Sequence, residues 1–493
     1  MVSIQEVAKH NKKNDVWVII HGKAYDVTEF LPSHPGGTKI IMRYAGADCT
    51  KKFDPVHPPD TLDKYLPKDK HLGEVTGGLG IKEEEKTIDP NELKRLDMVK
   101  RMPPLHQIYN LMDFEYVARH TMEANGWAYY SSGCDDEITL RENHYAYQRI
   151  YFIPRILVNV TNVDFTTTML GCKSSVPFYV TATALGKLGH QDGEKVLTRS
   201  CGSHGVIQMI PTLASCSFDE IVDAALPDQD QWFQLYVNSN RKVTEKLVRH
   251  AEARGMKGLF ITVDAPQLGR REKDMRSKYL ADAAEVQDEE NDGEIDRSQG
   301  AARAISSFID TGLCWEDLKW FRSITNMPIV LKGVLSTEDA LKAISCGVQG
   351  IVLSNHGGRQ LEFSRSGIEI LADLMPILHK RGLTDKIEVF VDGGVRRATD
   401  ILKAIALGAK GVGIGRPFLY AMSTYGDNGV KKAFQILKDE LLMNMRLLGV
   451  TSLDQLNEDY VDTRGLLNRF NAGDELFHKV YEPLDNPKFK PKL

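Results

Sequence analysis

The sequence lacks the features of a membrane-spanning, exported or nucleic-acid-binding chain. Among its 493 residues, no apolar run approaches the roughly 20 residues that span a bilayer. The opening stretch, MVSIQEVAKHNKKNDVW, has neither the apolar core of a signal peptide nor an Arg- and Ser-rich leader, so the sequence as given predicts a cytoplasmic protein. The formal net charge of -5 favours no general nucleic-acid role, since that role calls for a basic chain or patch.

Cysteine pairing is also missing from the sequence. The seven cysteines form no C-x-x-C pair and no C-x-x-C-H haem attachment motif. We therefore expect reduced thiols, and any haem must be held without covalent bonds to cysteine. The cysteines occupy positions 49, 134, 172, 201, 216, 314 and 346.

We place the chemistry in residues 350–361, GIVLSNHGGRQL. This stretch begins as an apolar run of strand type and ends in a glycine-flanked turn. His356 supplies an imidazole that accepts a proton near neutral pH, and Arg359 supplies a planar guanidinium that holds a carboxylate bidentately. The pair suits a 2-hydroxy acid substrate. The plainer interpretation is a strand ending in a turn that happens to contain both residues, because motif matches carry false positives.

Residues 2–75 predict a small module with two histidine-bearing loops. The strand candidates 16–20 and 23–27 are joined by a plausible turn at 21–22. His34 lies in LPSHPGG and His57 in FDPVHPP, where prolines fix the loops and glycines allow a cofactor edge to come close. Two neutral imidazoles held apart in this way suit the axial positions of one haem iron. Each loop alone is weak evidence, since a lone histidine is more often an ordinary surface residue.

Eight strand-like apolar runs follow, and most are separated by helical segments. This pattern predicts an α/β fold in which a parallel sheet closes as a (β/α)8 TIM barrel. The runs are 177–182, 206–210, 232–237, 258–263, 328–331, 350–353, 388–391 and 411–414. Because strand C-terminal ends converge on one mouth, we expect these side chains to face it: Thr183, Gln234, Tyr236, Thr262, Asp264, Lys332, His356, Arg359, Asp392 and Arg416.

Glycine-rich turns end the last two strands. VDGGVRR at 391–397 contains Asp392, Gly393, Gly394 and Arg396, and GVGIGRP at 411–417 contains Gly415 and Arg416. Barrels often bind a phosphate here with backbone N–H groups and a short helix N-terminus. We therefore expect a phosphate site after these two strands.

Composition predicts the domain limits. Typical domains of about 100 to 200 residues predict two or three for this chain. Residues 77–93 are glycine-rich and then charged, which is typical of a solvated hinge. We expect a module at 1–76, a hinge at 77–93, a barrel domain at 94–460 and a C-terminal tail at 461–493. Residues 282–296 are acidic and predict a mobile loop after the fourth strand.

Two stretches carry a family resemblance. SNHGGRQL at 354–361 resembles the signature of the FMN-dependent 2-hydroxy acid dehydrogenases and oxidases, and the likeness extends from Met102 to about Leu448. HPGG, together with Trp17, YDVT at 25–28 and Phe30, is similar to the cytochrome b5 family. The combination resembles the flavocytochrome b2 family.

This resemblance implies FMN and haem b as cofactors. It implies L-lactate or a similar 2-hydroxy acid as substrate, cytochrome c as electron acceptor, a homotetramer, and the mitochondrial intermembrane space as compartment. Flavin electrons would pass through the haem, because a flavin takes two electrons while a bis-histidine haem carries one and has no open position for oxygen.

The resemblance also implies a role for each candidate. His356 is the general base, Asp264 pairs with its imidazolium, and Lys332 lies near the pyrimidine side of the flavin. Substrate binding is assigned to Tyr129, Tyr236, Arg271, His356 and Arg359. FMN binding is assigned to Thr183, Ala184, Gln234, Thr262, Lys332, Asp392, Gly393, Gly394, Arg396, Gly415 and Arg416. The iron ligands are His34 and His57.

Several alternatives share these residues. An oxidase would pass electrons to oxygen, and a dehydrogenase for a larger acid such as mandelate would use the same catalytic groups. The small Ala184 beside Leu213 favours a short substrate side chain, while Pro211 stands where the family resemblance implies a small polar residue. A non-catalytic haem-binding protein is a third possibility, against which the intact His356 and Arg359 argue. The expected barrel also resembles that of the inosine-monophosphate dehydrogenases, but no cysteine of this sequence lies in a suitable catalytic loop.

Overall fold

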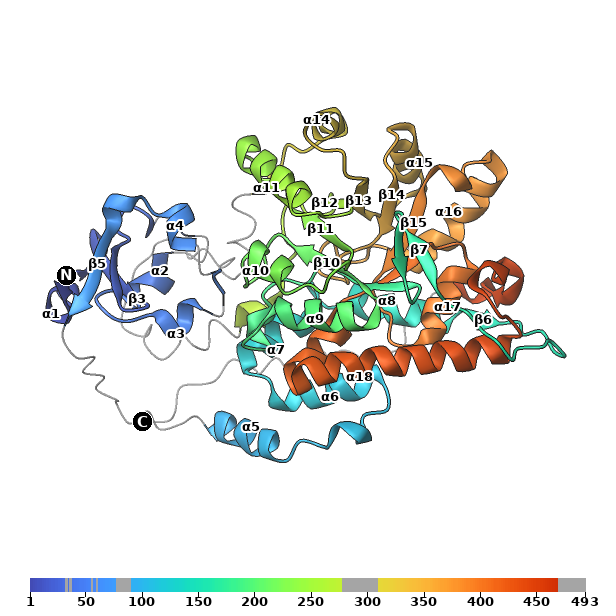
Figure 1. Cartoon of the computed structure of the whole chain (residues 1–493), viewed down its shortest axis with the longest axis horizontal. Helices are drawn as coiled ribbons and strands as arrows, with labels where there is room; N and C mark the ends of the chain where they lie inside the picture. Colours follow the sequence, from blue (N-terminus) through green and yellow to red (C-terminus); the bar gives the residue numbers. More distant parts are fainter. Residues whose placement is uncertain are drawn as a thin grey trace.

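The computed structural model describes residues 1–31, 34, 38–54, 56–58, 61–76, 90–276 and 309–468, without the side chains at 39 and 40 (Figure 1). The expected acidic loop at 282–296 lies outside these residues, as do positions 77–89 of the expected hinge and 469–493 of the expected tail. The glycines of HPGG also lie outside them.

The N-terminal module is built on a five-stranded sheet in the order β1-β5-β4-β3-β2. A turn at His21 and Gly22, both with positive φ, joins β3 to β4 as expected. The strands are β1 (Val2–Ser3), β2 (Asn11–Lys12), β3 (Asp15–Ile20), β4 (Lys23–Asp26) and β5 (His71–Thr76). The helices are α1 (Ile4–Val7), α2 (Thr38–Met42), α3 (Thr50–Phe53), α4 (Thr61–Tyr65) and the 3-10 turn η2 (Lys68–Lys70). Val16, Val18, Ile20, Tyr25 and Leu66 belong to a buried core of the module's own.

The closed parallel barrel predicted from the sequence is confirmed. Its strands pair in the circular order β9 to β16 and back to β9. They are β9 (Phe178–Val180), β10 (Ile207–Pro211), β11 (Gln231–Leu235), β12 (Leu259–Thr262), β13 (Ile329–Val334), β14 (Gly350–Leu353), β15 (Glu388–Asp392) and β16 (Gly411–Ile414). Some expected runs extended further because apolar residues continue past the last ladder bond, as at Ala182 and Val237.

Aromatic side chains fill the barrel interior. Tyr179, Trp232, Phe260 and Phe390 are fully buried and pack on one another, with the Trp232 and Phe260 rings stacked at a centroid distance of 4.9 Å. A hairpin of β7 (Thr167–Met169) and β8 (Cys172–Ser174) adds Met169 and Cys172 to the same cluster. The opposite, C-terminal ends of the strands are therefore left to form the pocket.

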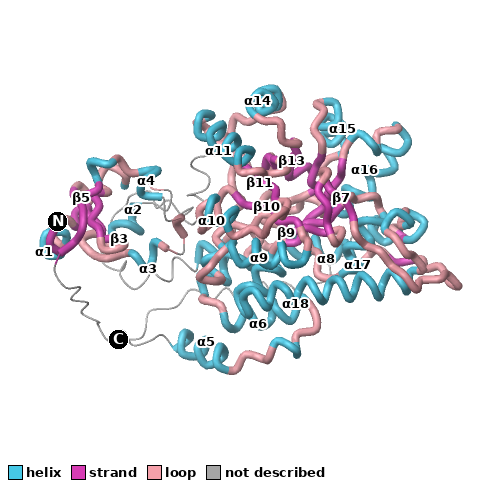
Figure 2. The backbone as a smooth tube through the Cα atoms, in the orientation of Figure 1, coloured by secondary structure: helices cyan, strands magenta, loops and turns pink. Residues whose placement is uncertain are grey.

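Helices surround the strands (Figure 2). They are α5 (Pro90–Lys100), α6 (Leu111–Thr121), α7 (Ala124–Ser131), α8 (Ile138–Gln148), α9 (Glu194–His204), α10 (Phe218–Asp223), α11 (Arg241–Ala253), α14 (Asp317–Ile324), α15 (Thr337–Ser345), α16 (Gly367–Arg381), α17 (Ala398–Ala406) and α18 (Arg416–Leu448). The 3-10 turns are η3 (Leu105–Gln107), η4 (Gly186–Leu188), η6 (Thr384–Lys386), η7 (Leu453–Gln455), η8 (Glu458–Tyr460) and η9 (Arg464–Leu467). None of the helices in the described ranges has the length and apolar content to cross a membrane.

Two of the expected segments contain regular secondary structure at one edge. Residues 90–93 of the expected hinge form the first turn of α5, where Pro90 suits a helix start. Residues 461–462 of the expected tail form β17 (Val461–Asp462), which pairs with β6 (Tyr151–Phe152). The long helix α18 begins at the barrel mouth and is kinked at Gly426.

Removal of an interior ring should destabilise the barrel. Phe390→Ala would leave a cavity among Tyr179, Trp232 and Phe260, so we expect a loss of about 3–5 kcal/mol in the free energy of unfolding. Denaturant unfolding followed by tryptophan fluorescence measures this loss. Phe363→Ala is the matched control, because Phe363 is 72% exposed. Equal losses in both variants would contradict the interior packing.

Candidate functional site

A pocket opens at the C-terminal ends of the barrel strands. The structure brings together here nearly all the barrel residues predicted from the sequence. Those that line the pocket are Tyr129, Thr183, Ala184, Gln234, Tyr236, Thr262, Arg271, Lys332, His356, Arg359, Asp392, Gly393, Gly394, Arg396, Gly415 and Arg416. Asp264 lies directly behind His356, to which it is bonded.

The turn that carries His356 has an unusual backbone. His356, Gly357 and Gly358 follow β14 with φ values of 60°, 64° and 74°, so all three are left-handed. A Cβ at position 358 would lie 2.5 Å from the backbone of Leu140 on α8. Glycine at 358 therefore lets the turn pack against α8, and Ser354 Oγ accepts a hydrogen bond from the His356 N–H at 3.0 Å.

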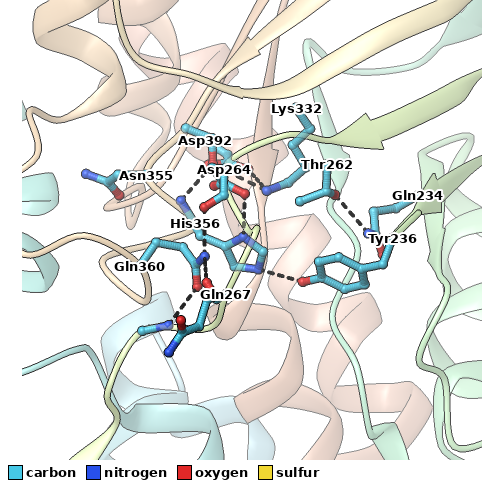
Figure 3. A network of polar contacts seen from close by, with 12 residues as sticks. Gln234, Tyr236, Thr262, Asp264, Gln267, Lys332, Asn355, His356, Gln360 and Asp392 are labelled. Atoms are coloured by element: carbon cyan, nitrogen blue, oxygen red, sulfur yellow. Dashed lines mark hydrogen bonds and ion pairs between the residues drawn. The ribbon is translucent and has the colours of Figure 1, made fainter. Parts of the chain in front are cut away.

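The His356 ring lies between a carboxylate and a phenol (Figure 3). Its Nδ1 is 3.2 Å from Asp264 Oδ1, and its Nε2 is 3.1 Å from the Tyr236 hydroxyl. Because an ionised carboxylate only accepts, Nδ1 carries the proton and Nε2 has a free electron pair. The ring is thus held with its basic nitrogen toward the pocket.

Burial and charge set the protonation states of this pair. Burial lowers the pKa of His356 below its usual value, although the Asp264 carboxylate opposes that shift. Burial by itself would raise the pKa of Asp264. In the acid range where this carboxyl titrates, the charge and hydrogen bond of protonated His356 and the charge of Lys332 together lower that pKa. The site therefore holds a neutral imidazole beside an ionised carboxylate at neutral pH. Such a pair suits proton abstraction.

Lys332 is a buried cation at the end of β13. It is 4% exposed, its Nζ is 3.6 Å from Asp392 Oδ2, and it donates to Ser354 Oγ at 3.3 Å. Gln234 Nε2 donates to Thr262 Oγ1 at 2.8 Å on the neighbouring strands (Figure 3). These groups form a polar floor beneath the His356 turn.

Three arginines give the pocket a positive potential. Arg271 is 3% exposed, and burial together with nearby Arg359 lowers its pKa to about 10. Arg359 Nη1 donates to the Tyr129 carbonyl at 2.7 Å, and its guanidinium lies 4.9 Å from the centre of the Tyr129 ring. Burial and Arg359 likewise lower the pKa of Arg416 to about 10. Arg271 and Arg416 stay charged at neutral pH because both pKa values remain well above 7, so the pocket favours anions.

The pocket arginines differ in how many of their N–H groups already bond to other residues of the protein. Arg416 donates to three carbonyls, those of Tyr130 at 2.8 Å and of Gly357 and Ser132 at 2.9 Å. Arg396 pairs with Glu115 at 3.2 Å. Within the described ranges, Arg359 Nε and Nη2 have no hydrogen-bond partner. The phosphate role of Arg416 and Arg396 stays a prediction, while Arg359 keeps donors for a carboxylate.

Orphaned polar atoms test whether the pocket fits a cofactor. Thr181 Oγ1, Asp264 Oδ2, Arg271 Nε and Asp392 Oδ1 are buried and have no hydrogen-bond partner among the described residues. Buried polar groups are rarely left in this state. Thr181, Arg271 and Asp392 line the pocket itself. Their chemistry, beside glycine turns and cations, fits a phosphate-bearing polar cofactor such as FMN.

The N-terminal module contains a second constellation, separate from the barrel pocket. The His34 and His57 rings have centroids 6.0 Å apart with a 32° angle between their planes. A metal–imidazole bond is about 2 Å long, so two such bonds and the ring halves account for this separation. His57 Nδ1 donates to the Phe53 carbonyl at 3.0 Å, which leaves Nε2 free as a ligand atom.

Burial also lowers the pKa of His57 to about 4, so its imidazole is neutral near pH 7 and able to bind a metal. In the part of the chain that the structure describes, no three His, Cys, Asp or Glu side chains gather to hold a bare metal ion. The spacing of the His34 and His57 rings and the neutral state of His57 fit a pair of residues that would hold a haem iron.

Several supporting residues were missed from the sequence. Asn143 and Asn355 exchange two side-chain hydrogen bonds of 2.8 Å, and Gly358 N donates to Asn355 Oδ1 at 2.9 Å. Gln360 Nε2 donates to the carbonyl of Asp264 at 2.8 Å (Figure 3). Asn355 and Gln360 belong to the motif SNHGGRQL, which signalled their importance but not their partners. Nothing in the sequence marks Asn143.

Comparisons with protein families divide the chain into two parts. Residues 118–463 match the family described as FMN-dependent dehydrogenase. Residues 3–76 match the family described as Cytochrome b5-like Heme/Steroid binding domain. The boundary between the matches agrees with the separate cores of the module and the barrel.

Whole-chain relatives combine both parts. The L-lactate dehydrogenase (cytochrome) of Wickerhamomyces anomalus is 58% identical over 99% of this chain and 84% of its own length. The enzyme of the same name from Saccharomyces cerevisiae is 54% identical over 98% of this chain and 83% of its own length. Glycolate oxidase of Spinacia oleracea is 39% identical, but covers 72% of this chain and 96% of its own length.

Solved structures agree. A flavocytochrome b2 variant with pyruvate bound superposes with a TM-score of 0.71 at 52% identity, covering 82% of this chain and 98% of that one. The chain belongs to the FMN-dependent dehydrogenase family, as an oxidoreductase that uses FMN and has a cytochrome b5-like haem-binding module at its N-terminus.

Proposed function

We propose that this protein oxidises L-lactate to pyruvate at FMN and passes the electrons one at a time through haem b to cytochrome c. The proposal rests on one observation above all, that a single chain joins a His356–Asp264 base in a cationic pocket to a separate pair of facing histidines. The two yeast relatives named above support the substrate and the acceptor.

His356 acts as the general base in this proposal. Its Nε2 takes a proton from the substrate as the alcohol carbon is oxidised, and Asp264 stabilises the imidazolium that results. Tyr236 now donates to Nε2, and it would turn the same hydroxyl toward the substrate oxygen. Burial and Asp264 raise the pKa of Tyr236, so it remains a neutral donor. FMN, when bound, supplies the two-electron acceptor.

The substrate carboxylate is placed against the arginines. Arg359 has Nε and Nη2 available within the described ranges, and Arg271 is buried beside it with an unpartnered Nε. Tyr129 completes this side of the pocket. We assign FMN binding to the polar floor of Lys332, Gln234 and Thr262 and to the remaining FMN-binding positions predicted from the sequence.

A short substrate side chain suits the part of the pocket wall formed by Ala184 and Leu213. Ala184 and Leu213 both line the pocket, and Pro211 lies beside them. This wall favours a methyl group over the phenyl group of mandelate, although a mandelate oxidase variant shares the barrel fold with a TM-score of 0.63 at 33% identity. The preference for lactate is therefore assigned to this wall.

The haem module supplies the route out. His34 and His57 would hold haem b, which, when bound, carries single electrons to an acceptor. With cytochrome c as that acceptor, we propose the mitochondrial intermembrane space as the compartment. We also propose the limits 1–76 for the module, 77–93 for the hinge, 94–460 for the barrel domain and 461–493 for the tail. The hinge then ends in the first turn of α5.

Self-association as a homotetramer has a structural candidate. The segment that follows β6 projects from the barrel domain (Figure 1). In it, Ile156 is 84% exposed, Leu157 100% and Val158 43%. Contiguous exposed apolar side chains of this kind mark interaction sites. We name residues 153–158 the apolar arm and propose that it contacts a second copy.

An anaerobic absorbance spectrum tests the proposal directly. Addition of L-lactate should bleach the flavin band and then reduce the haem band, and cytochrome c should be reduced when it is added. A flavin that lactate leaves oxidised would overturn the proposed substrate. Rapid peroxide formation in air, with little cytochrome c reduction, would instead identify an oxidase.

His356→Gln should lower turnover by about 10²- to 10⁴-fold, the usual contribution of a general base, while both cofactors stay bound. In the parent protein, kcat/KM should fall as the pH falls through the lowered pKa of His356, because the protonated ring accepts no proton. Stopped-flow flavin reduction measures the first effect and a pH profile the second. His379→Gln is the control, since His379 is exposed on α16.

Arg359→Lys should weaken substrate binding and turnover together. An ammonium does not reproduce a bidentate guanidinium, and loss of one charged hydrogen bond is worth about 1.5–3 kcal/mol, or about 10- to 100-fold in kcat/KM. Steady-state kinetics with L-lactate measures the change. Arg270→Lys, at the exposed neighbour of Arg271, should behave like the parent. Full activity in Arg359→Lys would show that other residues hold the carboxylate.

His57→Ala should remove or severely disturb the haem while the barrel stays folded on its own core. Lactate should still bleach the flavin, and a small artificial acceptor should still be reduced, but cytochrome c reduction should largely disappear. His21→Asn is the control in the same module, because Asn tolerates the positive φ of that turn. Parental cytochrome c reduction without a haem band would refute the electron route.

A further inference from the structure

Glu194, the first residue of α9, is a fully buried carboxylate whose partners are all neutral. Its Oε1 accepts from the N–H of Gly186 at 2.7 Å and of Ser215 at 2.9 Å. Its Oε2 accepts from the N–H of Cys216 at 3.1 Å and from Ser215 Oγ at 3.0 Å. Among the described residues, no Lys, Arg or His forms an ion pair with it. Both buried oxygens therefore have hydrogen-bond donors, as burial of a polar group requires.

These bonds join two loops of the barrel mouth. The first loop, residues 181–188, follows β9 and carries Ala184, and the second, residues 212–216, follows β10 and carries Leu213. Two hydrogen bonds join the loops directly. Leu185 N donates to the Leu213 carbonyl at 3.3 Å, and Lys187 N donates to Ser215 Oγ at 2.8 Å. The Glu194 carboxylate therefore provides most of the short hydrogen bonds that connect the loops.

The loops are shaped for this carboxylate. A Cβ at Gly186 would lie 2.9 Å from Glu194 Cδ, so the close approach depends on glycine at that position. From the other side, the Tyr130 hydroxyl donates to the Leu185 carbonyl at 2.7 Å. The first loop is thus held between α7 and α9 by two buried side chains.

We propose that Glu194 is a positioning residue that sets substrate specificity, because it fixes the spacing between Ala184 and Leu213. Both residues line the pocket. The hydrogen bonds of Glu194 go to Gly186, Ser215 and Cys216, and so reach Ala184 and Leu213 only through the backbone. The effect passes through the backbone of the two loops. This inference rests on the proposed function, since it concerns the wall assigned to the lactate methyl group.

Glu194→Gln isolates the effect with almost no change of shape. A carboxylate only accepts hydrogen bonds, whereas an amide directs an NH2 group at one set of backbone N–H donors. We expect the ratio of kcat/KM for L-lactate to that for L-2-hydroxypentanoate to fall by about tenfold, a change of the size that one or two methylenes decide in an apolar pocket. His356 and Arg359 are untouched, so lactate should still bleach the flavin.

A second measurement avoids turnover. Dissociation constants for pyruvate and 2-oxopentanoate, from equilibrium dialysis of the holoenzyme, should show the same loss of selectivity. Glu220→Gln is the matched control, because Glu220 caps α10 just beyond the second loop and does not bond the first. Ser215→Ala removes one connection between the loops and should lower the ratio in the same direction, by less.

A lower thermal stability in Glu194→Gln with both ratios unchanged would overturn the inference, because Glu194 would then serve stability alone. If Glu194→Gln does not fold, the ratios in Ser215→Ala decide in its place, and parental values there would overturn it. Failure of the parent protein to oxidise L-lactate would instead refute the proposed function, so the two failures are distinguishable.

Discussion

The hydrogen bond between His356 Nδ1 and Asp264 Oδ1 is the contact on which the site depends. It fixes which nitrogen of the ring is basic, and it joins the end of β12 to the end of β14 across the intervening strand. Several neighbouring contacts hold the His356 ring in place against Asp264. The left-handed run at 356–358 aims the ring, Gln360 holds the Asp264 backbone, and the Asn143–Asn355 pair anchors the turn to α8. The left-handed backbone at 356–358 costs free energy, and these surrounding contacts hold the turn in that conformation.

The pocket has more positively charged side chains than carboxylates. Arg271, Arg359, Arg416 and Lys332 outnumber the carboxylates that face them, and burial depresses the pKa of Arg271 and Arg416. A protein tolerates such mutual repulsion where an anion relieves it. A phosphate from the cofactor and a carboxylate from the substrate would both do so, which explains why one pocket suits two anionic groups. Arg416 already donates to three carbonyls, so it has fewer N–H groups left for an anion than an unpartnered guanidinium.

Local patterns in the sequence predicted the barrel and most of the residues at its mouth. Apolar runs of regular spacing found all eight strands, and the TIM barrel places strand ends together whatever their separation in sequence. Long-range partners could not be found this way. Asn143 is 212 positions from Asn355, and Glu194 bonds loops on two strands, so neither has a spacing that a single sequence reveals. The pairing of Val461 with Phe152 is a long-range partner of the same kind, whereas Pro90 marks the start of its helix locally.

Helix α18 separates two surfaces of the barrel domain. It begins at the mouth, where Arg416 bonds to the His356 turn, and ends at Leu448, whose carbonyl accepts from Arg155 in the apolar arm. The stretch beyond the kink at Gly426 alone spans roughly 30 Å at 1.5 Å per residue. A contact made through the arm would therefore lie at the opposite end of α18 from the mouth, separated from the pocket by the length of that helix.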